Sequence, residues 1–193
     1  MVLLKFDEIN KYQEFKAWLT SLKPSELMEE ENRMKSLDWM WELMEYLYVL
    51  GFNDAREELG VVAEDMATFL PSDYMDRKWD ALYKQYDGLD FSDRTKIYAE
   101  LGDIQSLLRV AETDGHRIYE SGGSTGAEGI ATTKTWHTMD DDRVRDTHEY
   151  LEERTVGINE RFYTFDGDSA MFPGDFSLVQ NNVRCRCWTT YNR

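Results

Sequence analysis

Apolar residues recur at steps of three and four through the first 111 residues of the chain. This spacing places them on one face of a helix, so it predicts a series of amphipathic helices. The predicted helices cover residues 8–22, 26–50, 53–69, 72–87 and 92–111. Pro24 and Pro71 fall between segments, where proline ends a helix, and Gly102 is a point at which the last helix is expected to kink.

The helix predicted over 26–50 has the strongest pattern. Its seven-residue repeat with apolar positions between is that of a heptad seam, and it consists of Leu27, Met34, Leu37, Trp41, Met44 and Tyr48. Gly51 follows at the position expected of a C-cap. The seam suits a helix hairpin within the chain, and the alternative is a seam for a helix of a partner protein.

A glycine-rich stretch occupies residues 121–129 and reads Ser-Gly-Gly-Ser-Thr-Gly-Ala-Glu-Gly. Glycine-rich loops can cradle phosphates, but no Gly-Lys-Ser or Gly-Lys-Thr follows, so a P-loop is excluded. The density of glycine leaves open whether a preceding helix continues through this stretch.

From residue 132 onward the pattern becomes that of short strands. A strand is predicted over 132–136, then a helix capped by Asp140, Asp141 and Asp142, with strands at 155–158, 162–165 and 183–191. The predicted fold class is therefore α+β. A helical N-terminal half, residues 1–90, precedes a small α+β domain, residues 91–193, with a short antiparallel sheet.

The net charge of the 193-residue chain is −16, from 22 basic and 38 acidic residues. A surface this negative repels the DNA backbone, so a general DNA-coating role is disfavoured. Hydrophobic residues make up 41% and aromatic residues 13%, which is enough for a real core. No apolar run approaches the ~20 residues of a membrane span, and the first five residues do not form a signal peptide, so a cytosolic product is expected.

The best candidate for metal chemistry is His148 with Cys185 and Cys187. One imidazole and two thiols can supply nitrogen and sulfur ligands to zinc, with Asp142 or His137 as a fourth ligand. The alternative is a buried polar cluster without metal. In a strand the two cysteines share a face, and a disulfide between them would close a small strained loop, so reduced thiols are expected.

Other candidate groups have weaker patterns. The three aspartates at 140–142 could bind a divalent cation, but a helix cap with Asp142 or Asp146 pairing Arg143 or Arg145 is favoured. Glu112 and His116 lie one helical turn apart and are expected to be structural. Cys185 near His148 is the only formal arrangement for nucleophilic catalysis. We therefore expect no catalytic residues, no enzyme and no cofactor beyond zinc.

Four pieces of the chain together carry a resemblance to a known family. They are Lys134 and Trp136 with the aspartate turn and His148, the helix over 109–119, the turn over 171–175 and the segment over 182–187. In this order, over roughly residues 107 to 190, they resemble the head-morphogenesis domain of tailed bacteriophages, the family of the F protein of phage Mu. The resemblance places this domain in residues 91–193.

The resemblance implies a non-enzymatic minor head protein of a phage or prophage, found in the phage head interior and, during assembly, in the host cytoplasm. Its implied partners are portal and capsid proteins, through which it influences head assembly or the fate of DNA. Because the same domain is sometimes joined to toxin or transferase modules, one alternative is a metal-dependent hydrolase or a toxin-like transferase. Another is a helical protein-interaction module unrelated to phage heads.

Overall fold

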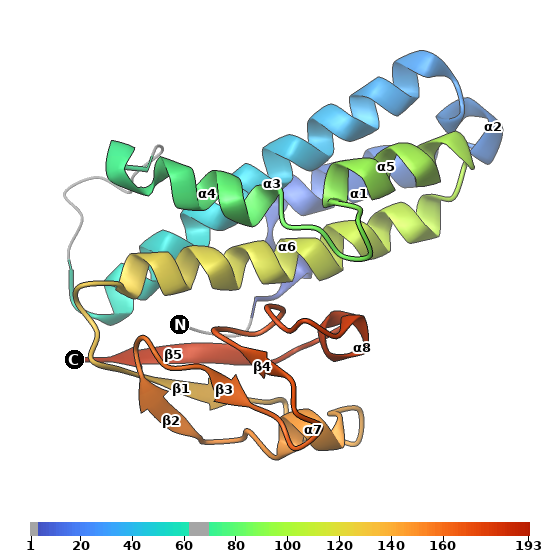
Figure 1. Ribbon diagram of the computed structural model, residues 1–193. Coiled ribbons are helices and arrows are strands. Elements are labelled where there is room, and N and C mark those ends of the chain that lie inside the picture. The colour runs from blue at the N-terminus through green and yellow to red at the C-terminus, as the bar shows by residue number, and fades with distance from the viewer. Residues whose placement is uncertain (1–3, 62–69) are drawn as a thin grey trace.

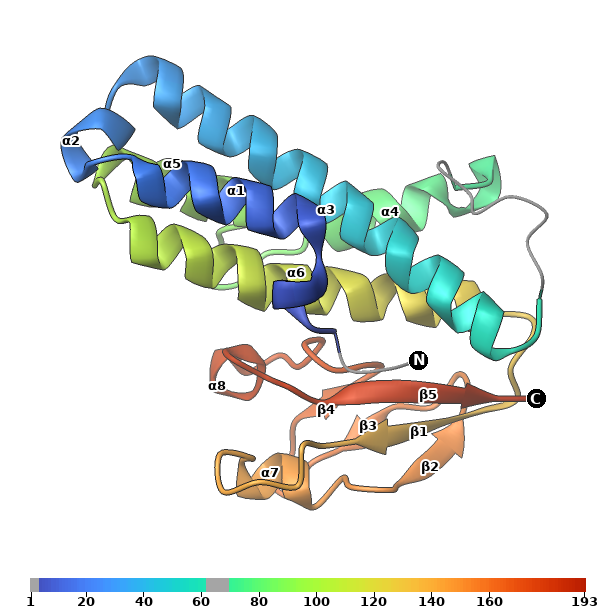
Figure 2. The same ribbon diagram turned by 180° about the vertical axis from the view of Figure 1, so that it is seen from behind.

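The computed structural model describes residues 4–61 and 70–193. A layer of helices lies over a smaller layer of strands, with β5 running beneath the long helix α6 (Figure 1 and Figure 2). This arrangement confirms the predicted α+β class, with helices first and a small antiparallel sheet last. Residues 62–69 of the third predicted helix lie outside the described residues.

The helical layer contains six α-helices and two short 3-10 turns among the described residues. They are η1 (Phe6–Glu8), α1 (Asn10–Ser21), α2 (Pro24–Leu27), α3 (Glu30–Glu58), η2 (Ser72–Tyr74), α4 (Met75–Leu82), α5 (Phe91–Glu100) and α6 (Ile104–Ala127). The long helices α3 and α6 pack along each other, with α1 on one side of the pair and α5 on the other (Figure 1 and Figure 2).

The strand layer follows α6. It consists of β1 (Thr133–His137), α7 (Asp146–Glu149), β2 (Thr155–Gly157), β3 (Phe162–Tyr163), β4 (Ser169–Ala170), α8 (Val179–Asn182) and β5 (Trp188–Asn192). The order of the main sheet is β2-β1-β5, antiparallel throughout, and β3 pairs with β4 separately. In this sheet Trp136 lies opposite Thr189.

Gly51 does not end a helix, so the predicted C-cap is wrong. α3 continues through it to Glu58, and residues 53–58 belong to α3 rather than to a separate helix. The physical reason is close packing: a Cβ on Gly51 would lie 2.9 Å from the carbonyl carbon of Tyr119 on α6. Glycine is therefore required here for contact between two backbones, not for a turn.

Residues 121–127 of the glycine-rich stretch form the last turns of α6, which runs unbroken to Ala127. A Cβ on Gly122 would lie 2.9 Å from the carbonyl carbon of Tyr48, and one on Gly126 would lie 3.0 Å from the carbonyl carbon of Phe52. The glycines thus let α3 and α6 approach closely along one face. They form a packing surface rather than a phosphate loop.

The heptad seam is partly used inside the chain. Met44 and Tyr48 are fully buried, and Tyr48 shares a hydrogen bond of 2.8 Å with Thr125 of α6. Trp41 is half-buried and meets the ring edge of Phe91 at a centroid distance of 4.6 Å. Met34, in the first turns of α3, is 55% exposed, whereas Leu27, the first residue of the seam, is fully buried but belongs to α2, a separate helix. The intramolecular hairpin therefore accounts for the inner part of the seam.

The fifth predicted helix is two helices. α5 ends at Glu100, Gly102 takes a left-handed backbone with φ of 66°, and α6 begins at Ile104. The cap of α5 is Asp90, which accepts hydrogen bonds from the amides of Ser92 and Asp93, so the helix begins at Phe91, one residue before its predicted start. Aspartate is among the preferred N-cap residues, and its negative charge is also favoured at the start of a helix.

The aspartate turn also differs from its prediction. α7 begins only at Asp146, its N-cap is Arg145, and no side chain caps it. Asp141 instead accepts a hydrogen bond from the amide of Arg143 and pairs with Arg186. Among the described residues, the arginine that pairs next to this turn is Arg143 with Asp141, and neither Asp142 nor Asp146 pairs with Arg143 or Arg145 as predicted. The last strand is also shorter than predicted, and both cysteines precede it.

Two hydrophobic cores form among the described residues. The larger joins α1 and α3–α6 and includes Tyr191 of β5, so it contains residues on both sides of the predicted boundary at 90 and 91. The smaller lies in the strand layer and consists of Trp136, Leu151, Phe162, Ala170, Phe176, Cys185 and Cys187. The boundary itself stays a prediction. None of the described helices combines the length and apolar character needed to cross a membrane.

Candidate metal centre

His148, Cys185 and Cys187 come together in the smaller core. The Nδ1 atom of His148 lies 3.7 Å from Sγ of Cys185 and 3.4 Å from Sγ of Cys187. All three residues are buried, with exposed fractions of 1%, 7% and 3%. Their three ligand atoms lie within 4.8 Å of one another, so the residues predicted from the sequence form one cluster. Both cysteines are free thiols, as predicted.

Aromatic rings hold the imidazole of His148 in place. The ring stacks on Phe176 at a centroid distance of 5.1 Å and meets Trp136 edge-on at 5.8 Å. Its Nε2 atom is buried without a hydrogen-bond partner among the described residues. The ring is therefore oriented by packing, and Nδ1 is the atom directed at the two thiols.

The predicted fourth ligands lie elsewhere. His137 shares a hydrogen bond of 2.8 Å with the hydroxyl of Thr190 and stacks on Trp188. Asp142 is exposed. Within the described part of the chain, the candidate ligand group contains only His148 and the two cysteines. The structure therefore places neither His137 nor Asp142, the two predicted fourth ligands, in this group.

Burial and mutual hydrogen bonding shift the pKa values of the two thiols in opposite directions. The pKa of Cys185 is lowered well below its ordinary value, chiefly by its hydrogen bond with Cys187 and also by His148. The pKa of Cys187 is raised well above it by the same pairing and by burial. The pair therefore loses its first proton more readily than its second.

His116 was predicted to be structural rather than to act as a pair with Glu112, and in the structure the two side chains have different partners. Its Nε2 atom lies 2.8 Å from the carbonyl oxygen of Cys187, and the side chain is buried. Glu112 instead accepts a hydrogen bond from the hydroxyl of Tyr12. His116 therefore supports the backbone of a candidate ligand from α6, which spacing along one helix could not reveal.

Four arginines surround the approach to the cluster. A cavity of about 610 Å³ is lined by Arg143, Arg145, Arg184 and Arg186 together with Cys185. Arg186 donates to both carboxylate oxygens of Asp141, at 2.8 and 2.5 Å, and this pairing holds the pKa of Asp141 well below its usual range. Asp141 of the aspartate turn is therefore one half of an ion pair that ties this turn to the segment of the two cysteines.

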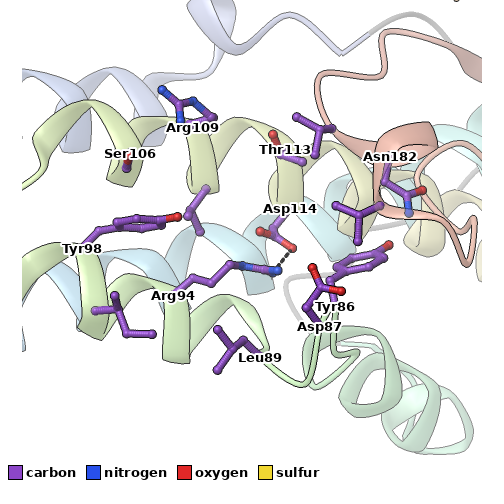
Figure 3. Close-up of a pocket in the computed structure, with 14 residues that line it drawn as sticks. Tyr86, Asp87, Leu89, Arg94, Tyr98, Ser106, Arg109, Thr113, Asp114 and Asn182 are labelled. Carbon is purple, nitrogen blue, oxygen red and sulfur yellow. Dashed lines mark hydrogen bonds and ion pairs between the residues drawn. The ribbon is translucent and has the colours of Figure 1, made fainter.

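A second cavity, of about 350 Å³, lies between α5, α6 and α8. Figure 3 shows Arg94 and Asp114 directed at each other across it, and their atoms Nη2 and Oδ1 are 2.8 Å apart. Asp114 also pairs with Arg117, which is 2% exposed and donates to the carbonyl oxygen of Ala81. Two of the charged residues that line this cavity, Arg94 and Asp114, are thus committed to interactions that join α5 and α6, and Arg117 extends them to α4.

Lys134 of the Lys-x-Trp strand is buried. Its ammonium donates to the carbonyl oxygen of Met171 at 2.9 Å and lies over the ring of Phe162. Burial, helped by the charge of Arg161, lowers the pKa of Lys134 from 10.5 to about 8. This lysine therefore links β1 to the loop after β4 and loses its proton more readily folded than unfolded.

We expect the stability of the protein to gain from Lys134 as pH rises from about 8 to 10. The folded state binds this proton more weakly than the unfolded chain, so unfolding takes up a proton in this window, and the contribution is about 1–2 kcal/mol. Urea unfolding at pH 7.5 and pH 10 measures it. Lys134→Met should lose this part of the pH dependence, whereas the exposed Lys96→Met should keep it. Identical pH profiles for the two variants would contradict the assignment.

Two characterised proteins are similar to parts of this chain. The NAD(+)–arginine ADP-ribosyltransferase EFV of Enterococcus faecalis (strain ATCC 700802 / V583) is 34% identical over 108 residues, covering 49% of this chain and 22% of the transferase. Minor head protein GP7 of Bacillus phage SPP1 is 29% identical over 85 residues, covering 42% of this chain and 28% of that protein. The chain therefore spans less than a third of the length of either relative.

No family model matches the chain, and no solved structure matches it. Part of the chain is thus related to a minor head protein of a phage. The narrower resemblance to the family of the phage Mu F protein stays a prediction.

Proposed function

We propose that this chain is a minor head protein of a phage or prophage that takes part in head morphogenesis. It joins the procapsid through the portal and resides in the interior of the phage head. The similarity to minor head protein GP7 carries this proposal. The cluster of Trp136, His148, Cys185 and Cys187 supports it, because the residues on which the head-domain resemblance rests share one buried core.

The helical layer is the docking part in this proposal, and the strand layer is a compact folded unit. Met34 of α3 is 55% exposed and Leu101, just after α5, is 67% exposed. An ion pair of 3.6 Å between Arg33 and Glu100 brings these two neighbourhoods together at one end of the helical layer. An exposed apolar pair at one site suits contact with another protein. DNA is a less favoured partner because the net charge is −16.

The double substitution Met34→Ser with Leu101→Ser is expected to weaken co-purification with the cognate portal roughly tenfold, since apolar anchors dominate interface energies. The substitution should leave the melting temperature nearly unchanged because both side chains are exposed. Pull-down from cells that assemble heads measures the first effect, and thermal unfolding measures the second.

Phe165→Ser is the matched control, because Phe165 is 62% exposed but lies in the strand layer. It should retain portal binding. If this control lost portal binding while the double variant kept it, the docking surface would lie on the strand layer instead. Failure of the unaltered chain to co-purify with its portal would contradict the proposed function.

The similarity to the ADP-ribosyltransferase supports one alternative, namely that this chain is itself a transferase, and that alternative can be tested. We propose that the chain itself is not an enzyme and that its likeness to that protein lies in a non-catalytic part. Purified chain incubated with NAD(+) and arginine should then release no nicotinamide above the buffer rate. Sustained release that scales with protein concentration would support a transferase instead.

A further inference from the structure

Hydrogen bonding alone does not account for the contacts at His148. The Nδ1 atom of an imidazole has either one lone pair or one N–H, so it makes one good hydrogen bond in the ring plane. Here two sulfurs approach the same atom, at 3.4 and 3.7 Å. A cation placed between the three atoms would satisfy all of them at once.

The separations are those that zinc imposes. With Zn–S of about 2.3 Å and Zn–N of about 2.0–2.1 Å, a tetrahedral ion holds its sulfur and nitrogen ligands about 3.6 Å apart. The two observed sulfur–nitrogen distances lie on either side of that value. A soft pair of sulfurs with one imidazole nitrogen selects zinc over magnesium or calcium, which prefer oxygen ligands. On binding, the thiols release their protons to solvent.

The fourth position faces a space that can hold a ligand. A hollow of about 10 Å³, roughly the size of one water, is bounded by His148 and Cys187. The cavity of about 610 Å³ is bounded by Cys185. Arg143, Arg145, Arg184 and Arg186 line both spaces. The cluster is therefore reached through an arginine-lined approach.

This approach is cationic in a strongly acidic chain. Four arginines face two carboxylates there: Asp141, held by Arg143 and Arg186, and Glu112, held by Tyr12. Arg145 is aimed by its bond to the carbonyl oxygen of Val183. Arg184 is exposed on a left-handed backbone with φ of 55° and forms no ion pair within the described residues. Arginines in this arrangement attract anions.

We propose that His148, Cys185 and Cys187 bind one zinc ion through three protein ligands, and that its fourth ligand is an anionic oxygen drawn from the arginine-lined cavity. The oxygen belongs to a carboxylate or a phosphate. Sites with three protein ligands and one open position are the form in which zinc binds exchangeable ligands. This proposal does not depend on the role in the phage head.

Metal content tests the first part. Protein purified from zinc-supplemented cells should contain one zinc per chain by mass spectrometry, and Cys185→Ser and Cys187→Ser should each lose it. Removal of zinc from the unaltered chain with a chelator should lower its melting temperature by roughly 5 °C or more, which keeps the test valid if a variant does not fold. Zinc-free protein whose melting is unaffected by chelator or by added zinc would overturn the proposal.

Cobalt(II) in place of zinc tests the open position. The visible bands of the cobalt-loaded chain should shift on addition of acetate if a carboxylate is the ligand, or of inorganic phosphate if a phosphate is. Arg184→Gln should lower the affinity for the anion that shifts the bands about fivefold, without changing the metal content. Arg154→Gln, which removes a charge stacked on Tyr150 outside the cavity, should leave the affinity unchanged. Bands unaffected by either anion would overturn the open position and indicate a closed site.

Discussion

Replacing Gly122 by alanine is expected to destabilise the protein by about 3 kcal/mol, in the upper range for overpacking. The new Cβ would lie 2.9 Å from the carbonyl carbon of Tyr48 and 3.1 Å from the amide nitrogen of Phe52. Both are backbone atoms of α3, which cannot rotate away. The clash outweighs the gain of about 1 kcal/mol that alanine brings to a helix interior. Urea unfolding followed by circular dichroism measures the difference.

Gly115→Ala is the matched control on the same helix. The three atoms nearest its Cβ would all be side-chain atoms, namely Cδ1 of Leu47 at 2.8 Å and Cε1 and Cζ of Phe6 at 3.1 Å. These groups can shift, and the gain in helix propensity offsets the remaining strain, so the net change should stay within about 1 kcal/mol. Equal destabilisation by the two substitutions would show that backbone contact between α3 and α6 is not what Gly122 provides.

The periodicity of the sequence predicted the helices but not how they join. The spacing of Met44 and Tyr48 correctly placed both on a packing face, because that spacing depends only on helix geometry. The role of Gly51 was misjudged because a glycine after an apolar run suits both a C-cap and a close helix contact. Only the partner backbone at Tyr119 separates the two, and it lies far along the chain.

The metal candidates could be predicted because their chemistry is rare in this chain. His148 and the two cysteines stand out by residue type, and the structure brings them together. His116 and Arg186 could not be assigned in the same way. Their roles depend on the carbonyl oxygen of Cys187 and on Asp141, contacts between distant segments that no periodicity encodes. The aspartate cap failed for the same reason, because a long-range ion pair outweighed a local preference.

Trp136 lies at the centre of the smaller core. Trp136 has no exposed surface, and its ring meets Phe162 at 5.1 Å, Phe176 at 5.6 Å and His148 at 5.8 Å between centroids. Its indole Nε1 makes no hydrogen bond of ordinary geometry among the described residues, although its interaction with the thiol of Cys187 acts to lower the pKa of that thiol, so the main contribution of this side chain is its volume. Removing that volume leaves the candidate ligand His148 without one of its two aromatic supports.

Trp136→Ala is therefore expected to cost about 3–5 kcal/mol, the range for truncation of a fully buried tryptophan. Trp136→Phe should cost less than half of that, because it keeps an aromatic ring and gives up only the weak interaction of the indole with the thiol of Cys187. Amide hydrogen exchange locates the damage: protection should fall first in β1 and β5, where Trp136 pairs with Thr189, and later in α3 and α6. Uniform loss of protection would show that the two cores unfold as one unit, and unchanged protection in β1 would contradict the central position of Trp136.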